Sequence, residues 1–175
     1  MSHFTILTYP DPRLKMKCEP VPYVDAEIRD LMKEMTTMLY KVTAGGYAAP
    51  QFGILKRIIV LDDSYGRDPN RQFRMVNPEI IWQSEELVSM AEGCMSIPWG
   101  RIDVIRPEKV KVRYTNENNE ICETDIESDY MGRCLQHEID HLDGLLSIDR
   151  VSKMKRDMFI RKIHRRKEQG RSFDD

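Results

Sequence analysis

The chain of 175 residues is 41% hydrophobic and 32% charged, an ordinary globular composition with enough residues for one self-supporting core. No apolar run approaches the ~20 residues that span a bilayer, so we expect no membrane segment. The net charge of -2 hides an asymmetry, because residues 150–171 hold ten Lys/Arg and two acidic residues, whereas the remainder holds 17 basic and 27 acidic residues. A basic C-terminal segment on an acidic body points to an anionic partner.

The first residues, MSHFTILTYPDPRLK, lack a basic start followed by an apolar run and a small-residue cleavage site. We therefore expect no secretory signal and predict a cytoplasmic protein. Cys18, Cys94, Cys122 and Cys134 form no CxxC pair, and a chain of this size needs no disulfide framework. Free thiols in a reducing compartment are the expectation.

The first regular element is a helix over residues 26–42. Asp25 is a favourable N-cap, and Gly45 with Gly46 would supply the stop. The apolar residues at helical spacing are Ile28, Leu31, Met32, Met35, Met38, Leu39 and Val42.

Short β-branched stretches follow, and they are typical of antiparallel strands. The sequence NENN at 116–119 reads as a turn between the last two of them. The expected strands are residues 57–61, 73–76, 79–82, 87–90, 110–114 and 121–126.

A second helix is expected from a cap at Ser128 or Asp129 to about Asp143, with Gly144 as its stop. A third should cover about residues 151–167. Its apolar side would carry Val151, Met154 and Met158. These elements predict one α+β domain, with antiparallel strands around the second helix, an N-terminal helix and a basic C-terminal helix.

The second helix carries CLQHEIDHLDG at 134–144. His137 and His141 are one turn apart, about 6 Å along the axis, so both imidazoles can reach one ion. Glu138 stands beside the first histidine, as in other HExxH sites. The pattern predicts a metal site that lacks one ligand.

Candidates for the third ligand differ in reach. Cys134 lies about 10 Å along the axis from His141, too far for a short side chain, and is better placed as a pocket wall. The peptidase pattern HExxHxxGxxH fails because Ser147 stands where its third histidine should be. Glu168 has no supporting motif. Cys94 in AEGCMSIP remains, with a purely structural cysteine as the alternative.

Three ordered segments together resemble peptide deformylases: GGYAAPQ at 45–51, EGCMS at 92–96 and QHEIDHLDG at 136–144. Lesser likenesses extend the resemblance from about residue 4 to 150. By this resemblance residues 1–150 form the catalytic domain, and residues 151–175 are a basic helix and tail of the same domain.

The resemblance implies that Cys94, His137 and His141 bind one divalent metal ion, with water in a fourth position. Such a set accepts Zn2+, Fe2+, Co2+ or Ni2+. The family typically works with Fe2+ in the cell, and isolated protein often carries Zn2+ or Ni2+. Glu92 is expected to fix the loop around Cys94.

The implied reaction is hydrolysis of the N-formyl group from the initiator methionine of new polypeptides, which releases formate. Glu138 would act as general base and then as general acid. By resemblance, the amide of Gln51 and the N–H of Met95 stabilise the charge on the former carbonyl oxygen. Arg101 matches a position that helps to hold the substrate backbone.

Gly45 and Gly46 fit a segment where substrate backbone lies against protein backbone. Gly45 and Cys134 are expected to line the pocket for the methionine side chain. The family usually shows GxGLAAPQ, whereas this chain has Ala44 for the first glycine and Tyr47 for the leucine. Tyr47 adds bulk and a hydroxyl near the pocket, a change that bears on substrate preference or rate.

Two other functions stay open from the sequence. An HExxH metallopeptidase would need a downstream ligand, and an inactive deformylase-like module would bind ribosomes through the basic helix, with Tyr47 as its only support. The basic residues of that helix are either a solvated face or a contact for ribosomal RNA: Arg161, Lys162, Arg165, Arg166 and Lys167. We expect no DNA or membrane partner.

Overall fold

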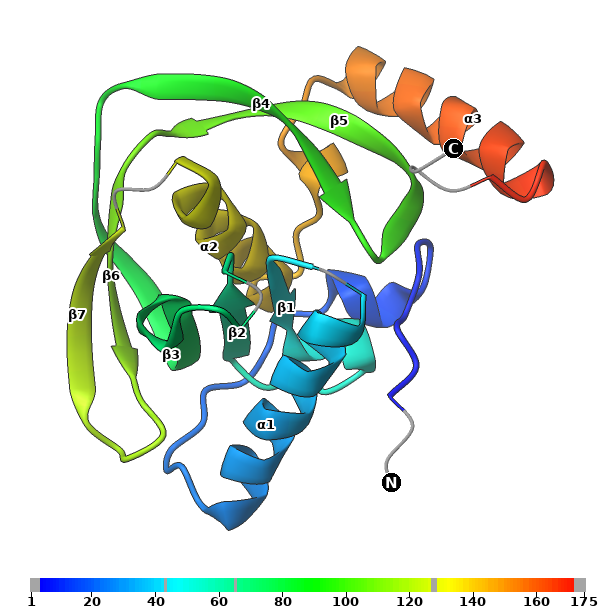
Figure 1. Ribbon diagram of the computed structural model, residues 1–175. Coiled ribbons are helices and arrows are strands. Elements are labelled where there is room, and N and C mark those ends of the chain that lie inside the picture. Colours follow the sequence, from blue (N-terminus) through cyan, green and yellow to red (C-terminus); the bar gives the residue numbers. More distant parts are fainter. Residues whose placement is uncertain (1–3, 43, 65, 127–128, 172–175) are drawn as a thin grey trace.

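A computed structural model of the protein describes residues 4–42, 44–64, 66–126 and 129–171 (Figure 1). The helices are α1 (Ala26–Lys41), α2 (Asp129–Leu142) and α3 (Lys153–Glu168). The strands are β1 (Gly46–Ala48), β2 (Ile58–Asp62), β3 (Gln72–Gln83), β4 (Leu87–Cys94), β5 (Ile97–Pro107), β6 (Val110–Thr115) and β7 (Ile121–Ile126). These elements confirm the predicted α+β class.

The strands form two antiparallel sheets. One has five strands in the order β1-β2-β3-β6-β7, and the other is the hairpin of β4 and β5. Figure 1 shows α2 lying between the five-stranded sheet and this hairpin, which arches over it. The helix with the HExxH motif is therefore central, as the sequence predicts.

The predicted N-terminal helix is confirmed as α1. Asp25 caps it by accepting the N–H of Ile28 at 2.9 Å, and Met32, Met35 and Leu39 are fully buried. Their side chains pack in one cluster with residues of β2, such as Ile58. The expected glycine stop is wrong, because α1 already ends at Lys41 and the glycines lead into β1.

Most predicted strands are present, with two differences. Residues 73–76 and 79–82 belong to one strand, β3, in which a shift of register occurs where Asn77 has a φ of 50°. Strand β5 was not expected, because Pro98, Gly100 and the inward-facing Arg106 obscure its alternation.

One face of α2 packs on the five-stranded sheet. Leu135, Ile139 and Leu142 share a buried cluster with residues of β2 and β6. Burial of each such side chain contributes roughly 1.5–3 kcal/mol. The suggested cap Ser128 lies outside the described residues. Gly144 is confirmed as the stop, with a φ of +72° that other residues rarely adopt.

The third predicted helix exists as α3, but its buried face differs from the prediction. Met154 and Met158 are 74% and 57% exposed, whereas Phe159 and Ile163 are buried against the β4–β5 hairpin. The ring of Phe159 lies over Gly100, where a Cβ would come within 3.0 Å of it. A short apolar pair, one turn apart, is therefore enough to dock a mostly basic helix.

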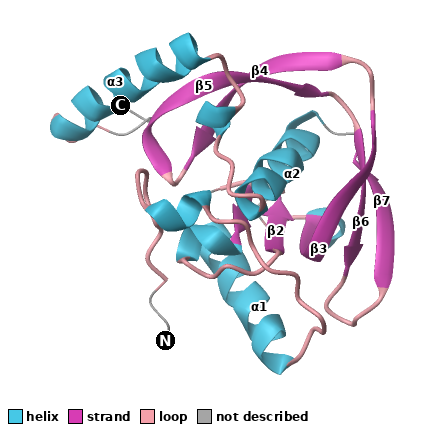
Figure 2. Cartoon of the chain, turned by 180° about the vertical axis from the view of Figure 1, so that it is seen from behind, coloured by secondary structure: helices cyan, strands magenta, loops and turns pink. Residues whose placement is uncertain are grey.

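Helices α1 and α3 lie at opposite ends of the molecule, as the view from behind also shows (Figure 2). Among the described residues, no helix is both long and apolar enough to cross a membrane.

Candidate active site

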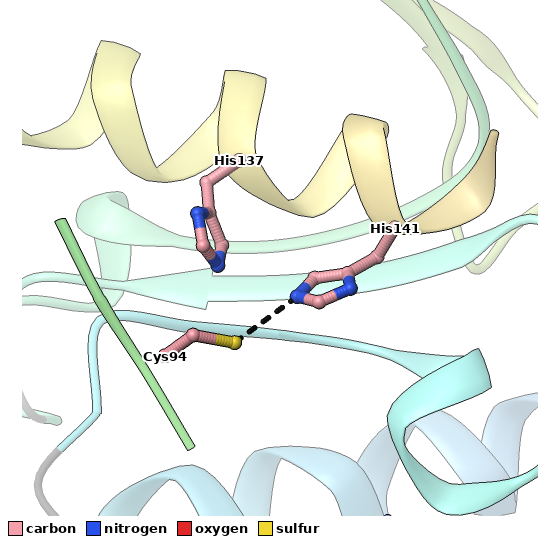
Figure 3. A group of neighbouring side chains, drawn as sticks. All are labelled: Cys94, His137 and His141. Atoms are coloured by element: carbon pink, nitrogen blue, oxygen red, sulfur yellow. Dashed lines mark hydrogen bonds between the residues drawn. The ribbon is translucent and has the colours of Figure 1, made fainter. Parts of the chain in front are cut away.

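The β4–β5 hairpin and α2 bring Cys94, His137 and His141 together (Figure 3). Their ligand atoms all lie within 4.8 Å of one another, and Nε2 of His141 is 3.3 Å from Sγ of Cys94. Neighbouring donors around a tetrahedral ion are about 3.5 Å apart. One thiol and two imidazoles in this arrangement therefore fit a single divalent ion, and three protein donors leave a four-coordinate ion one further position.

Hydrogen bonds at Nδ1 fix the ring orientation of His137. Its Nδ1 lies 3.0 Å from Oε2 of Glu92 and 3.3 Å from Oγ of Ser147. A carboxylate can only accept, so Nδ1–H donates to Glu92 and Nε2 is left to face the centre. In the sequence, Ser147 stands out only because the peptidase pattern would have its third histidine at this position. In the structure Ser147 is buried and supports His137.

Glu92 is the hub of a buried ionic network. Arg106 donates to both of its carboxylate oxygens at 2.6 and 3.0 Å, and Arg133 donates to Oε1 at 3.0 Å. Arg106 also donates to Asp140 at 2.8 Å. Burial acts to raise the pKa of Glu92, but the hydrogen bonds of Arg106 and His137 outweigh it and hold that pKa well below its usual range.

The sequence assigned Glu92 to fixing the loop around Cys94 and gave no sign of its bonds to His137, Arg106 and Arg133. Arg106, Arg133 and Asp140 are each at least nine-tenths buried. From the sequence, charged residues such as these are expected at the surface. One signal was available for Arg106: along the strand it falls on the same side as Ile102 and Val104, which is the inner face of β5.

Glu138 points into the same site and is 4% exposed. Its Oε2 has no hydrogen-bond partner among the described residues. Burial raises its pKa to about 7, so the carboxyl can both accept and give up a proton near neutral pH. A Cβ on Gly46 would come within 2.9 Å of Oε1, so glycine there leaves room for the carboxylate.

Gln51 is buried with its amide held in one orientation. Oε1 accepts the N–H of Ala48 at 2.9 Å, so Nε2 points to Oγ of Ser96 at 3.3 Å and toward Sγ of Cys94 at 3.7 Å. The amide group is thus aimed at the centre, as a donor to a developing charge must be.

A short N-terminal segment ties together the elements that carry the two expected donors. The N–H of Leu7 donates to the carbonyl of Gln51 at 2.7 Å, and the N–H of Tyr9 donates to that of Ser96 at 2.8 Å. Ser96 follows Met95 in the tight turn between β4 and β5. The positions of Gln51 and Met95 therefore depend on the same strap.

A cavity of about 470 Å³ opens beside the metal-ligand cluster. It is lined by every residue that the sequence analysis assigned to catalysis or substrate binding: Gly45, Gly46, Tyr47, Gln51, Met95, Arg101, Cys134 and Glu138. A wider cleft of about 1040 Å³ lies between the two sheets and is lined by none of these residues. The smaller cavity is the one that belongs to the metal-ligand cluster.

Two of the lining residues have distinct surroundings. Tyr47 is fully buried with its ring centroid 5.0 Å from that of Phe52, and its hydroxyl has no hydrogen-bond partner among the described residues. Burial raises the pKa of the Cys134 thiol to about 12. Cys134 stands outside the cluster of possible ligands, in agreement with a wall and not a ligand.

Residues 3–157 match the family described as polypeptide deformylase. A peptide deformylase of Rickettsia typhi is 42% identical over 173 residues, which cover 95% of this chain and 98% of that protein. A peptide deformylase structure from Legionella pneumophila superposes with a TM-score of 0.87 at 34% identity, covering 97% of this chain and 98% of the other. One from Ehrlichia chaffeensis, in complex with actinonin, gives 0.83 at 36% identity, covering 94% and 98%.

Proposed function

The chain belongs to the polypeptide deformylase family, and on this premise we propose how its residues remove the N-formyl group from the initiator methionine of nascent polypeptides. One observation carries the assignment of roles: Cys94, His137 and His141 cluster beside the buried carboxyl of Glu138. The relatives described above are deformylases, so the metallopeptidase and the inactive module gain no support.

Cys94, His137 and His141 would hold the divalent ion, which we propose to be Fe2+ in the cell, with Zn2+, Ni2+ or Co2+ acceptable to the same donors. When bound, such an ion supplies a Lewis acid that lowers the pKa of a coordinated water and polarises the formyl oxygen. Reconstitution of metal-free protein with each ion, followed by metal analysis and formate release, ranks the four.

Glu138 moves the proton. Its carboxylate accepts a proton from the attacking water while the oxygen of that water bonds to the formyl carbon. The same proton then passes to the leaving nitrogen as the C–N bond breaks, which yields formate and a free amine. The absence of a hydrogen-bond donor to Oε2 among the described residues supports this role, because none of them competes with the water for it.

Two donors would stabilise the negative charge on the former carbonyl oxygen. They are Nε2 of Gln51, whose orientation is fixed by the N–H of Ala48, and the backbone N–H of Met95 in the hairpin turn. Both belong to elements that the N-terminal strap holds.

The remaining lining residues would bind the substrate. Gly45, Gly46 and Arg101 all line the cavity, and Arg101 lies beside Gly93. Cys134 and Tyr47 complete the wall. We propose that substrate backbone lies along the glycines and that the methionine side chain enters the part lined by Cys134.

The test is formate release from a formyl-Met dipeptide by wild-type protein and by Glu138→Gln, which keeps the shape of the side chain but cannot accept the proton. We expect Glu138→Gln to keep the metal and to lose at least about a hundredfold in kcat. Activity within a few-fold of wild type would remove Glu138 from its proposed role.

A second proposal concerns α3 as a contact for ribosomal RNA. Arg161, Lys162 and Arg165 are exposed on this helix, on the side left free by the buried Phe159 and Ile163. Attraction to phosphates by such a face is strongly salt-dependent. Because α3 packs into the main body, we propose that residues 151–175 form one domain with residues 1–150 and not a detachable tail.

Truncation of α3 would therefore disturb the fold, and charge reversal is the cleaner test. Arg161→Glu, Lys162→Glu and Arg165→Glu together should abolish co-sedimentation with ribosomes at low salt. The same change of charge at the exposed Lys17, Lys41 and Lys56 is the control and should leave it intact. Equal sedimentation of both variants would contradict RNA contact through α3.

We also propose that the enzyme acts in the cytoplasm, where nascent chains emerge. Its four cysteines are free, which suits a reducing compartment. Fractionation of cells that express the protein, followed by immunoblotting, tests this location.

A further inference from the structure

Gly45 and Tyr130 fit against each other at the cavity wall. A Cβ on Gly45 would lie 2.7 Å from the hydroxyl oxygen of Tyr130 and 3.0 Å from Sγ of Cys134. Backbone conformation does not demand glycine here, because no left-handed φ occurs at this position. A side chain at position 45 would therefore compete for space with the phenol from α2.

The hydroxyl of Tyr130 reaches the part of the cavity lined by Gly45 and Cys134. Tyr130 is 46% exposed, yet its hydroxyl converges on Gly45 and Cys134, which both line the cavity. It also hydrogen-bonds the thiol of Cys134. The phenol thus has one edge in solvent and its polar end in the wall, directed at a sulfur atom.

The rest of this wall is only partly apolar. Val42 and Met90 supply apolar surface, and Arg133 lies beside Tyr130 with its guanidinium bound to Glu92 and to the carbonyls of Val88 and Val104. Arg133 is therefore fixed, whereas a hydroxyl can rotate its hydrogen between acceptors. The Tyr130 hydroxyl can therefore adjust to a bound side chain in a way that Arg133 cannot.

We propose that Tyr130 determines side-chain specificity by donating a hydrogen bond to the thioether sulfur of the substrate's methionine. The inference rests on the proposed function, which assigns the methionine side chain to the part of the cavity lined by Cys134, and Tyr130 lines the same cavity. A site built around a polar group discriminates against an analogue that cannot pair with it.

Norleucine is the discriminating analogue, since it replaces the sulfur of methionine by a methylene of similar size. Thioether sulfur is a weak acceptor, and Tyr130 keeps Cys134 as a partner when norleucine is bound. We therefore expect a modest preference, with kcat/KM for a formyl-Met dipeptide about two- to tenfold above that for the matching formyl-norleucine dipeptide.

The experiment measures both substrates with wild-type protein and with Tyr130→Phe. The ratio of the two kcat/KM values should fall to about one in Tyr130→Phe, because only the donor is lost. Tyr23→Phe, at a tyrosine that is 65% exposed and does not line the cavity, is the matched control and should keep the wild-type ratio.

The contact with Gly45 gives a second readout. Gly45→Ala should lower kcat/KM for both dipeptides, because the new methyl group displaces the phenol. Combination with Tyr130→Phe removes the oxygen that lies 2.7 Å from the methyl position and should recover part of that loss. Additive losses in the double variant would contradict the proposed fit.

The outcomes separate this inference from the function on which it rests. A wild-type ratio of about one, or a preference that survives Tyr130→Phe, overturns the role of Tyr130 while leaving deformylation standing. Failure of metal-loaded protein to release formate from either dipeptide overturns both.

Discussion

The two faces of α2 are both buried, but one is apolar and contributes to stability, whereas the other carries the polar groups of the site. The face with Leu135, Ile139 and Leu142 packs on the five-stranded sheet and contributes stability through apolar area. The other side of α2 buries polar groups, which costs free energy unless each is paired: His137 lies toward the β4–β5 hairpin, and Glu138 lies beside Gly46 of β1.

The cost on the polar face is limited by a chain of paired charges. Asp140, Arg106, Glu92 and His137 follow one another through hydrogen bonds, so each of these four groups has a partner of opposite sign or a donor. Replacement of such networks by apolar groups is often stabilising in other proteins. We infer that this one is retained because it orients His137.

The largest expected effect is at a metal ligand. His141→Ala should abolish metal binding and formate release, because two protein donors remain of three. Circular dichroism should still report a folded protein, since the apolar face of α2 is unchanged. His164→Ala, on the exposed side of α3, is the control and should keep one metal per chain. Stoichiometric metal in His141→Ala would contradict the ligand assignment.

Arg106→Met tests the buried ion pairs of Arg106 while keeping a side chain of similar size in the same place. Glu92 and Asp140 would lose a shared buried cation, and we expect the free energy of unfolding to fall by about 3–5 kcal/mol in urea titrations. Metal affinity should also fall, by about 10- to 100-fold, because Glu92 no longer holds His137 firmly. Arg113→Met breaks an exposed pair with Glu123 and should cost less than about 1 kcal/mol. Equal costs at the two arginines would argue against the buried network.

Leu135→Ala tests the opposite face. Loss of this fully buried side chain should lower the free energy of unfolding by about 3 kcal/mol, while metal content per folded molecule stays at one. Ile121→Ala, at a side chain that is 77% exposed, should change stability by less than about 0.5 kcal/mol. Loss of metal in Leu135→Ala under conditions where it is folded would show that the two faces are not separable.

The smallest expected effect is a gain in stability. Tyr47→Phe removes a buried hydroxyl that has no partner among the described residues, and we expect the free energy of unfolding to rise by about 1 kcal/mol. Tyr40→Phe is the matched control, because that hydroxyl donates to Asp62 at 2.7 Å and its loss should destabilise by a similar amount. A destabilised Tyr47→Phe would mean that its hydroxyl is paired in solution.

Local patterns predicted the parts of the site that lie close together in the chain. HExxH fixes His137 and Glu138 on one turn, and the spacing alone carries that information. Cys94 could be chosen only through resemblance, because nothing local shows which strand crosses the helix. For Ser147 the sequence showed only that this position is not a histidine ligand. Its contact with His137 could not be predicted, because it depends on how the chain folds back after α2.

Where the prediction failed, tertiary contact decided between equivalent patterns. In α3, Met154 and Met158 have the same spacing as Phe159 and Ile163, so periodicity alone cannot choose the buried pair. The flat surface at Gly100 makes the choice by accepting an aromatic ring. Arg106 and Arg133 were missed for a related reason, because composition cannot reveal that a charge will find its partner inside.

The packing of α3 also sets an order of events during synthesis. Cys94 shares a buried cluster with Phe159 and Ile163, which are translated long after it. The hairpin that presents the thiol is therefore fully packed only after α3 has been made and has docked. We infer that the position of this metal ligand depends on residues far downstream of it in the chain.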